Sequence, residues 1–315
     1  MMKKIRKVFK VMLYAVCTVL SIVMIAWAGL NIVKYIIYSD YYSNKTDITD
    51  IPGLNDDFVC QGICVSEEQG KILVCGYMTD GTNSRIYVTD RNGNSYHVKL
   101  LREGEIYKGH AGGIALSGET LLISNGSRLF TFSLSSVLSA SDGDTVEIGT
   151  GTRVNNAASF VYADDFCVYV GEFHDGVGYV KDHPYDTPNG VNHAIITCYS
   201  ADDLSTPLRV YSIPDRVQGA CITDDGRMVL STSYGLADTV YLVYSLDGAF
   251  DSGETLDGAP VYYLSAPERE IHGPAMGEDM DFSEGRIITL SENSTRKYLF
   301  GKLFFGGQIV SLDFK

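Results

Sequence analysis

The longest apolar stretch of the chain runs from Val11 to about Tyr38, and only small or weakly polar residues interrupt it before Asn31 and Lys34. At about 1.5 Å per residue, roughly 20 such residues cross a hydrocarbon core of about 30 Å. Beyond this stretch the apolar segments are short, rich in Val, Ile, Tyr, Phe and Thr, and separated by Gly, Asp, Asn and Ser. The pattern predicts one apolar helix followed by an all-β body.

The β body repeats one motif five times. In each copy a small or polar residue precedes an apolar strand, a tight turn, a second apolar strand, a polar loop and a third strand. The copies start at QGICV (61–65), GGIAL (112–116), ASFVY (158–162), QGACI (218–222) and EDMDF (278–282). Fourth strands are predicted at 95–101, 144–150, 207–213 and 259–265. The fifth copy has only three strands before the chain ends.

Antiparallel units of this kind cannot bury both faces alone, so we expect them to stack radially as blades. The fold class is therefore all-β, a five-bladed β-propeller preceded by one transmembrane helix, with a six-bladed ring as the alternative. Residues 46–51 (TDITDI) would supply the missing outer strand of the last blade. Through the quoted repeats, residues 58–315 resemble the β-propeller superfamily of YncE-like, strictosidine-synthase-like and quinoprotein-like proteins. The resemblance implies an architecture and no particular chemistry.

The chain order suggests four segments. Residues 1–10 form a basic tail, 11–38 the membrane helix, 39–57 a tether with the possible ring-closing strand, and 58–315 the propeller. Five positive charges before the helix place the N-terminus in the cytoplasm and the propeller outside the cell membrane. A cleaved signal peptide is the alternative, because Ala26-Trp27-Ala28 fits a small-x-small cleavage pattern.

The charge of the chain limits the classes of molecule that it can bind. Of 39 acidic and 25 basic residues, all the acids but only 19 bases follow residue 37, a formal charge of −20 for that part. Nucleic acid is excluded as a partner. The expected partners are the lipid bilayer, through residues 11–38, and an unidentified polar ligand or extracellular protein.

The cysteines show no C-x-x-C pair and no zinc-binding spacing. Cys64 and Cys221 share a column of small residues on the innermost strands, so we expect packed thiols. A two-residue turn at Gln69-Gly70 would place Cys64 opposite Cys75, which leaves a cross-strand disulfide open.

Two rings of residues are candidate ligand contacts, because innermost-strand entrances and the loops after second strands converge on one end of a propeller channel. The first ring contains Gln61, His110, Asn156, Gln218, Glu278 and Asp279. The second contains Tyr77, Glu172, His174 and Glu292. The alternative interpretation of the first ring is that its side chains hydrogen-bond neighbouring blades.

An insertion in the third blade, 173–191, is bordered by His193 and carries His174 and His183. The spacing of these histidines matches no standard metal motif, so we expect a solvated lid loop, no metal site and no cofactor. A calcium ion on the axis, held by Glu278, Asp279 and Asn156, is the alternative.

These residues favour a binding or scaffolding module over an enzyme. The resemblance to five-bladed glycosidases would require acids on successive innermost strands, and Gln61, His110 and Asn156 stand there instead. A calcium-assisted lactonase or phosphotriesterase with His110 as acid or base, or a glycan hydrolase, is the alternative function. No G-x-S-x-G elbow, P-loop or dinucleotide fingerprint occurs in the sequence.

Overall fold

The N-terminal part of the protein is helical. The computed structural model describes residues 2–179, 181–304 and 306–314, in two compact units that divide between Ser43 and Asn44. The first unit contains α1 (Met2–Ile37) and most of α2 (Ser39–Asn44). Within α1, Ile5–Ile37 is long and apolar enough to cross a membrane, a property that a signal sequence near the N-terminus would share.

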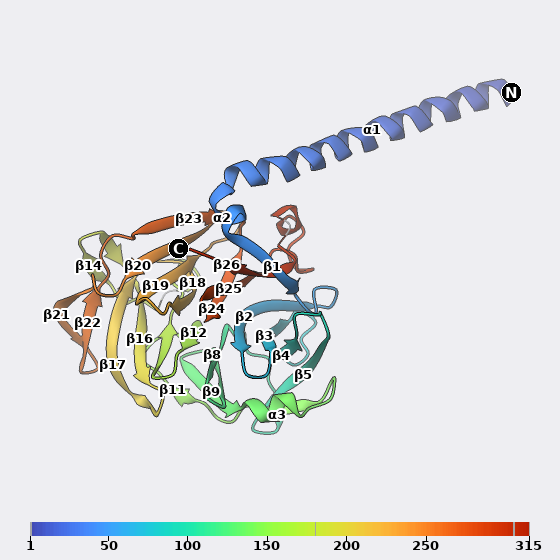
Figure 1. Ribbon diagram of the computed structural model, residues 1–315. Coiled ribbons are helices and arrows are strands. Elements are labelled where there is room, and N and C mark those ends of the chain that lie inside the picture. Colours follow the sequence, from blue (N-terminus) through green and yellow to red (C-terminus); the bar gives the residue numbers. More distant parts are fainter. Residues whose placement is uncertain (1, 180, 305, 315) are drawn as a thin grey trace. The chain divides into compact units, whose positions relative to one another are not determined.

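The second unit is a ring of five β-sheet blades (Figure 1). The first blade contains β2 (Phe58–Ser66), β3 (Lys71–Met78), β4 (Arg85–Thr89) and β5 (Ser95–Arg102), with β6 (Glu105–Ile106) beside β5. The second contains β7 (Gly113–Ser117), β8 (Thr120–Asn125), β9 (Arg128–Ser133) and β11 (Thr152–Arg153). The third contains β12 (Phe160–Ala163), β13 (Cys167–Gly171), β16 (Ala194–Ser200) and β17 (Asp203–Ile213).

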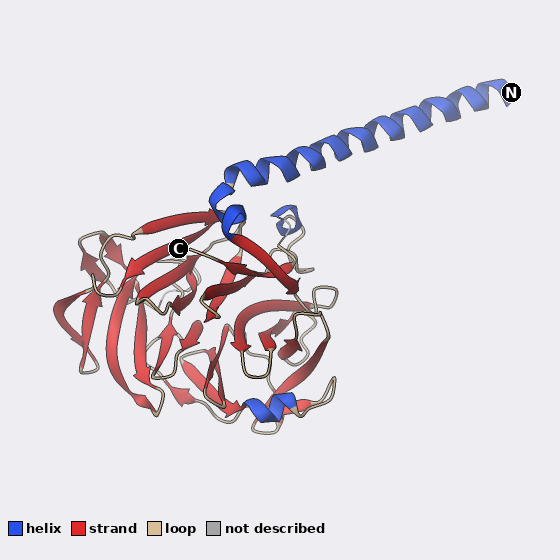
Figure 2. Cartoon of the chain, viewed as in Figure 1, coloured by secondary structure: helices blue, strands red, loops and turns tan. Residues whose placement is uncertain are grey.

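The remaining blades complete the ring. The fourth contains β18 (Val217–Ile222), β19 (Arg227–Thr232), β20 (Thr239–Ser245) and β23 (Arg269–Gly273). The fifth contains β24 (Gly277–Ser283), β25 (Arg286–Ser291), β26 (Gln308–Leu312) and β1 (Lys45–Asp50). Figure 2 shows short helical segments only in connections of this unit, among them α3 (Leu134–Leu138) and the 3₁₀ turn η1 (Gly301–Phe304). The predicted five-bladed propeller is confirmed.

The innermost strands pack side by side around the axis in the order β2, β7, β12, β18 and β24, and β24 returns to β2. Glycine permits this approach. A Cβ on Gly62 would lie 2.6 Å from the backbone nitrogen of Ile114 in the next blade, and one on Gly113 would lie 2.6 Å from that of Val161. Side chains cannot be accommodated at such distances, so the glycines that recur in the repeat set the narrow radius of the ring.

The ring closes with strands from both ends of the chain. β1 pairs antiparallel with β26, from Lys45 opposite Leu312 to Asp50 opposite Gln308. The strand pairing therefore lies where the sequence predicts it, at the outer edge of the fifth blade. Ile51 follows β1 and packs into a core with Phe58, Ile288 and Ile309, which joins the fifth blade to the first.

Two predicted outer strands belong elsewhere. Residues 144–150 were expected in the second blade, yet β10 (Thr145–Glu147) pairs parallel with β5 of the first. Residues 259–265 were expected in the fourth blade, yet β22 (Ala259–Tyr263) pairs parallel with β17 of the third and forms a hairpin with β21 (Phe250–Leu256). In both cases the strand covers the outer edge of the preceding blade. A later strand, β11 in the second blade and β23 in the fourth, takes the outer position instead.

The cysteines are free thiols. The turn between β2 and β3 is longer than expected and pairs Ser66 with Lys71, so Cys64 faces Leu73 and Cys75 faces Gly62. The cross-strand disulfide between Cys64 and Cys75 that the sequence left open is therefore not formed. Burial raises the pKa of the Cys64, Cys75 and Cys221 thiols well above the usual range, as expected for packed, unreactive side chains.

Candidate functional site

A cavity of about 480 Å³ lies at the end of the ring where the innermost strands begin. Its walls come from the starts of innermost strands and from loops that follow second strands. Six of the predicted contacts line it, namely Gln61, Tyr77, His110, Gln218, Glu278 and Glu292. Both predicted rings therefore contribute to one concave site, although their role in binding remains a prediction.

Two carboxyl groups meet on one side of the cavity. Glu278, in β24, and Glu292, directly after β25, are hydrogen-bonded to each other. Burial raises the pKa of both groups, and the charge of Glu292 raises that of Glu278 further. Ionising both of these neighbouring carboxyl groups would place two negative charges side by side, which costs free energy. The pair therefore retains a proton more strongly than free glutamates do.

The amide of Gln61 connects this pair to His110. Its Nε2 donates to Glu292 Oε2 at 3.0 Å, and its Oε1 accepts from His110 Nε2. Burial, with a smaller contribution from Lys297, lowers the pKa of His110 to about 4. His110 is therefore neutral at physiological pH with its proton on Nε2, where it acts as a hydrogen-bond donor rather than as a base.

Aromatic rings and one cation border the same chain of hydrogen bonds. The His110 ring stacks on Tyr77 with centroids 4.6 Å apart. Lys297 donates to the Tyr77 hydroxyl at 2.5 Å and lies over the ring of Tyr298. Tyr298 in turn hydrogen-bonds to Glu292. The positive charge of Lys297 is thus held beside the carboxyl pair.

Four predicted contacts do not line the cavity. Asn156 is fully buried, donates to the Val170 carbonyl at 2.7 Å and accepts from the Ala158 amide at 2.9 Å. These bonds hold the backbone of its own blade, not that of a neighbouring blade as the alternative interpretation has it. They also engage a group proposed for axial calcium. The others are Asp279, Glu172 and His174.

Asp279 occupies the glycine position of the repeat and is fully buried near the axis. Space for it comes from Gly219, where a Cβ would lie 2.5 Å from the Asp279 Cα. Neither carboxyl oxygen has a hydrogen-bond partner of normal geometry. Desolvation raises its pKa well above the usual range, although nearby backbone N–H groups oppose the shift, so the group is a poor anionic ligand at neutral pH.

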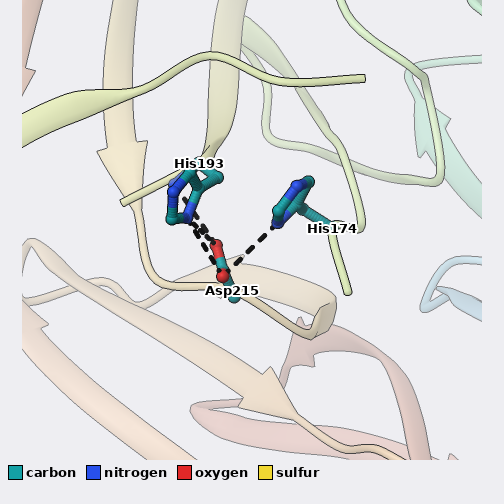
Figure 3. A group of neighbouring side chains, drawn as sticks. All are labelled: His174, His193 and Asp215. Atoms are coloured by element: carbon teal, nitrogen blue, oxygen red, sulfur yellow. Dashed lines mark hydrogen bonds and ion pairs between the residues drawn. The ribbon is translucent and has the colours of Figure 1, made fainter. Parts of the chain in front are cut away.

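The third-blade insertion contains more structure than a solvated lid, including the hairpin of β14 (Tyr185–Thr187) and β15 (Gly190–Asn192). At its base Glu172 is fully buried and lies 2.5 Å from His183 Nδ1. His174 and His193 converge instead on Asp215, in the loop between β17 and β18 (Figure 3). Ligand atoms of these three residues lie within 4.8 Å of one another, an arrangement that sequence spacing did not predict.

Several residues that line the cavity were not predicted from the sequence. Lys297 and Tyr298 lie in the long connection between β25 and β26, and Phe173 and Tyr179 lie in the third-blade insertion. Neither segment has a counterpart in the other blades, so aligning the repeats could not assign them. The excess length of these two connections was the available signal.

Neither a family model nor a curated protein matches the sequence. Solved β-propeller structures do superpose on it. Hydrazine synthase of Kuenenia stuttgartiensis is 13% identical over 77% of this chain and 57% of that chain, with a TM-score of 0.42. The PQQ-bound aldose sugar dehydrogenase of Streptomyces coelicolor is 14% identical over 78% and 76%, with a TM-score of 0.44. BamB of Moraxella catarrhalis is 9% identical over 81% and 83%, with a TM-score of 0.34.

At this level of similarity, the ligands, reactions and partners of those proteins cannot be assigned to this chain. This chain spans little more than half of the hydrazine synthase chain. The fold is defined by the chain's own closed set of paired strands.

Proposed function

We propose that the protein is a membrane-anchored, extracytoplasmic propeller that binds a small uncharged polar ligand, such as a sugar unit of a glycan, in the central cavity. The observation that carries the proposal is the lining of that cavity. Hydrogen-bonding groups of Gln61, His110 and the carboxyl pair stand beside the rings of Tyr77, Tyr234 and Tyr298. Aromatic faces and fixed polar groups together suit a polyhydroxylated ring.

The charges of the cavity favour a neutral ligand. Glu278 and Glu292 have raised pKa values and share a hydrogen bond, and the pKa of His110 is lowered to about 4. Lys297 already lies beside Tyr77 and Tyr298. A strongly charged ligand would find no unopposed counter-charge, whereas hydroxyl groups could both donate and accept.

Saturation-transfer NMR on the full-length chain in detergent, with a panel of neutral mono- and disaccharides, tests this. We expect at least one sugar to bind and Gln61→Ala to weaken it tenfold or more, because the side chain that joins His110 to Glu292 is lost. Gln69→Ala is the matched control, since Gln69 is exposed in the β2–β3 turn. Failure of the whole panel, or equal losses in the two variants, would contradict the proposal.

The anchor is supported by charge and length. Lys3, Lys4, Arg6, Lys7 and Lys10 precede an apolar helix that continues to Ile37, and such a charge bias directs the N-terminus to the cytoplasm. The intact mass of the membrane-extracted protein separates the two alternatives. We expect the full 34.5 kDa, whereas cleavage after Ala28 would remove about 3 kDa.

A hydrolase is the second candidate, and the carboxyl pair favours it, because acids with raised pKa values cluster at catalytic sites. The pair is hydrogen-bonded, which is closer than the roughly 5 Å that retaining glycosidases require. Turnover of glycosides or lactones that is lost in Glu278→Gln would establish this function in place of binding alone.

A further inference from the structure

The two histidines and the aspartate at the base of the third-blade insertion differ from every other histidine contact of the protein. Four further histidines are present, and three of them, His97, His183 and His272, each face one carboxylate. Among the residues that the structure describes, only Asp215 has two imidazoles beside it, those of His174 and His193, with their rings stacked 4.9 Å apart (Figure 3).

We propose that His174, His193 and Asp215 bind one Zn²⁺ ion, with the fourth coordination position open to solvent. Two imidazole nitrogens and one carboxylate oxygen form a ligand set that zinc prefers. The site is separate from the central cavity, and the proposal does not depend on the ligand of that cavity.

The distances fit a shared ion. In a tetrahedral site with metal–ligand bonds of about 2.0 to 2.1 Å, neighbouring ligand atoms lie about 3.3 Å apart. Asp215 Oδ2 is 3.4 Å from His174 Nδ1 and 3.2 Å from His193 Nδ1. The ligand atoms of all three side chains lie within 4.8 Å of one another. The two stacked imidazoles would turn toward Asp215 Oδ2 to share a single ion.

The hydrogen bonds leave the right atoms for a metal. His174 is only 7% exposed, and its Nδ1 has no hydrogen-bond partner. Asp215 Oδ1 accepts the backbone N–H of His193 at 3.2 Å, which orients the carboxylate. His193 Nδ1 lies 3.3 Å from Oδ1 and 3.2 Å from Oδ2, a contact that metal binding would replace. Buried polar atoms normally have a partner. A metal ion at this position would supply one for His174 Nδ1.

The backbone already holds the three ligands together. His174 lies three residues after β13 and His193 directly before β16, two paired strands of the third blade. The N–H of Arg216, next to Asp215, donates to the His174 carbonyl at 3.0 Å. The ligands are thus preorganised, and the ion would fasten both ends of the insertion to the loop between the third and fourth blades.

Exposure indicates where the fourth position lies. The side chains of His193 and Asp215 are about one-third exposed, at 34% and 36%, while His174 is buried. Three protein ligands with one accessible side is the arrangement of zinc sites that retain a water molecule. Phe173 and Asp175, which flank His174, line the central cavity, so the ion would also stabilise that wall.

The test is a titration of the full-length, chelator-treated protein in detergent with Co²⁺, followed by displacement with Zn²⁺. We expect one Co²⁺ per chain, visible absorption bands of tetrahedral intensity and no thiolate charge-transfer band, and complete displacement by Zn²⁺. Absence of stoichiometric binding, a thiolate band from the cysteines, or preference for Ca²⁺ or Mg²⁺ over Zn²⁺ would overturn the proposal.

Variants assign the ligands. His193→Ala and Asp215→Asn, at partly exposed positions, should each raise the Kd for Zn²⁺ at least tenfold. His272→Ala is the matched control, because His272 is exposed and pairs with Asp238 at 3.3 Å. The Kd of this variant for Zn²⁺ should not change. Circular dichroism shows whether each variant folds. If His193→Ala does not fold, His193→Gln is measured in its place. Equal weakening by His272→Ala and His193→Ala would contradict the assignment.

Discussion

The third and fifth blades each carry a glutamate at the same position of the repeat, and its hydrogen-bond partner differs between the two blades. Glu172 directly follows β13 and lies 2.5 Å from His183. Glu292 directly follows β25 and is hydrogen-bonded to another acid, Glu278. The difference lies in the segments around them, since the third-blade insertion supplies a histidine and the fifth blade supplies a second carboxyl. Equivalent positions in a propeller thus need not share chemistry.

The two blades also differ in how the chain builds them. The third blade has its four main strands in one stretch of sequence and gains the β21–β22 hairpin on its outer edge. The fifth joins β24, β25 and β26 to β1 from the other end of the chain. Its integrity therefore depends on residues that lie far apart in sequence, whereas additions to the third blade leave the ring itself intact.

Truncation of Ile51 should have the largest effect, because it weakens this long-range closure. Ile51 is 3% exposed and packs between the fifth and first blades. We expect Ile51→Ala to lower the free energy of unfolding by about 2 to 4 kcal/mol, as for other buried aliphatic truncations. Denaturant unfolding of the full-length chain measures it. Ile106→Ala, at a residue that is 55% exposed, is the control, and similar losses in both variants would show that closure contributes little.

The next largest effect should come from the buried glutamate of the third blade. Glu172 accepts the amides of Ala157 and Ile195, each at 3.2 Å, in addition to His183. In Glu172→Gln one oxygen becomes a donor, so an acceptor is lost inside the blade, at a cost of about 1 to 3 kcal/mol. Denaturant unfolding at pH 7 is the measurement. An unchanged free energy would mean that the insertion is not held through Glu172.

Sequence alone predicts the features that repetition encodes. Apolar strands recur with glycines at the same place, because five blades must approach one axis, and Gly62 and Gly113 show how closely they do. The ring and its closing strand follow from that pattern. The extra strands β10 and β22 do not, since an apolar strand can cover either neighbouring blade edge and its local pattern is the same in both places.

The candidate site follows the same division. Gln61 and Glu278, which line the cavity, lie at repeated positions, so counting blades could identify them. Lys297 comes from a connection unique to the fifth blade, and Asp215 from a short loop whose neighbours in space are distant in sequence. Tertiary packing brings such residues together from distant parts of the chain. Rules based on the sequence spacing of metal ligands therefore do not detect them.

The acid pair of the fifth blade should give the smallest effect, visible through its dependence on pH. Burial raises the folded-state pKa of both Glu278 and Glu292 above unfolded values near 4.5, and the charge of Glu292 raises that of Glu278 further. Their contribution to stability is therefore complete below about pH 4.5 and is lost as pH rises through the folded-state pKa values. Glu292→Gln removes one of these acids, and its amide oxygen can still accept the proton that Glu278 donates. Relative to the unmodified chain, we expect it to gain about 1 kcal/mol between pH 5 and pH 8 in denaturant unfolding. Glu172→Gln is the matched variant, and we expect it to be less stable than the unmodified chain because it loses an acceptor for two backbone amides. If both variants change equally with pH, the two glutamates are equivalent after all, and the contrast between the blades fails.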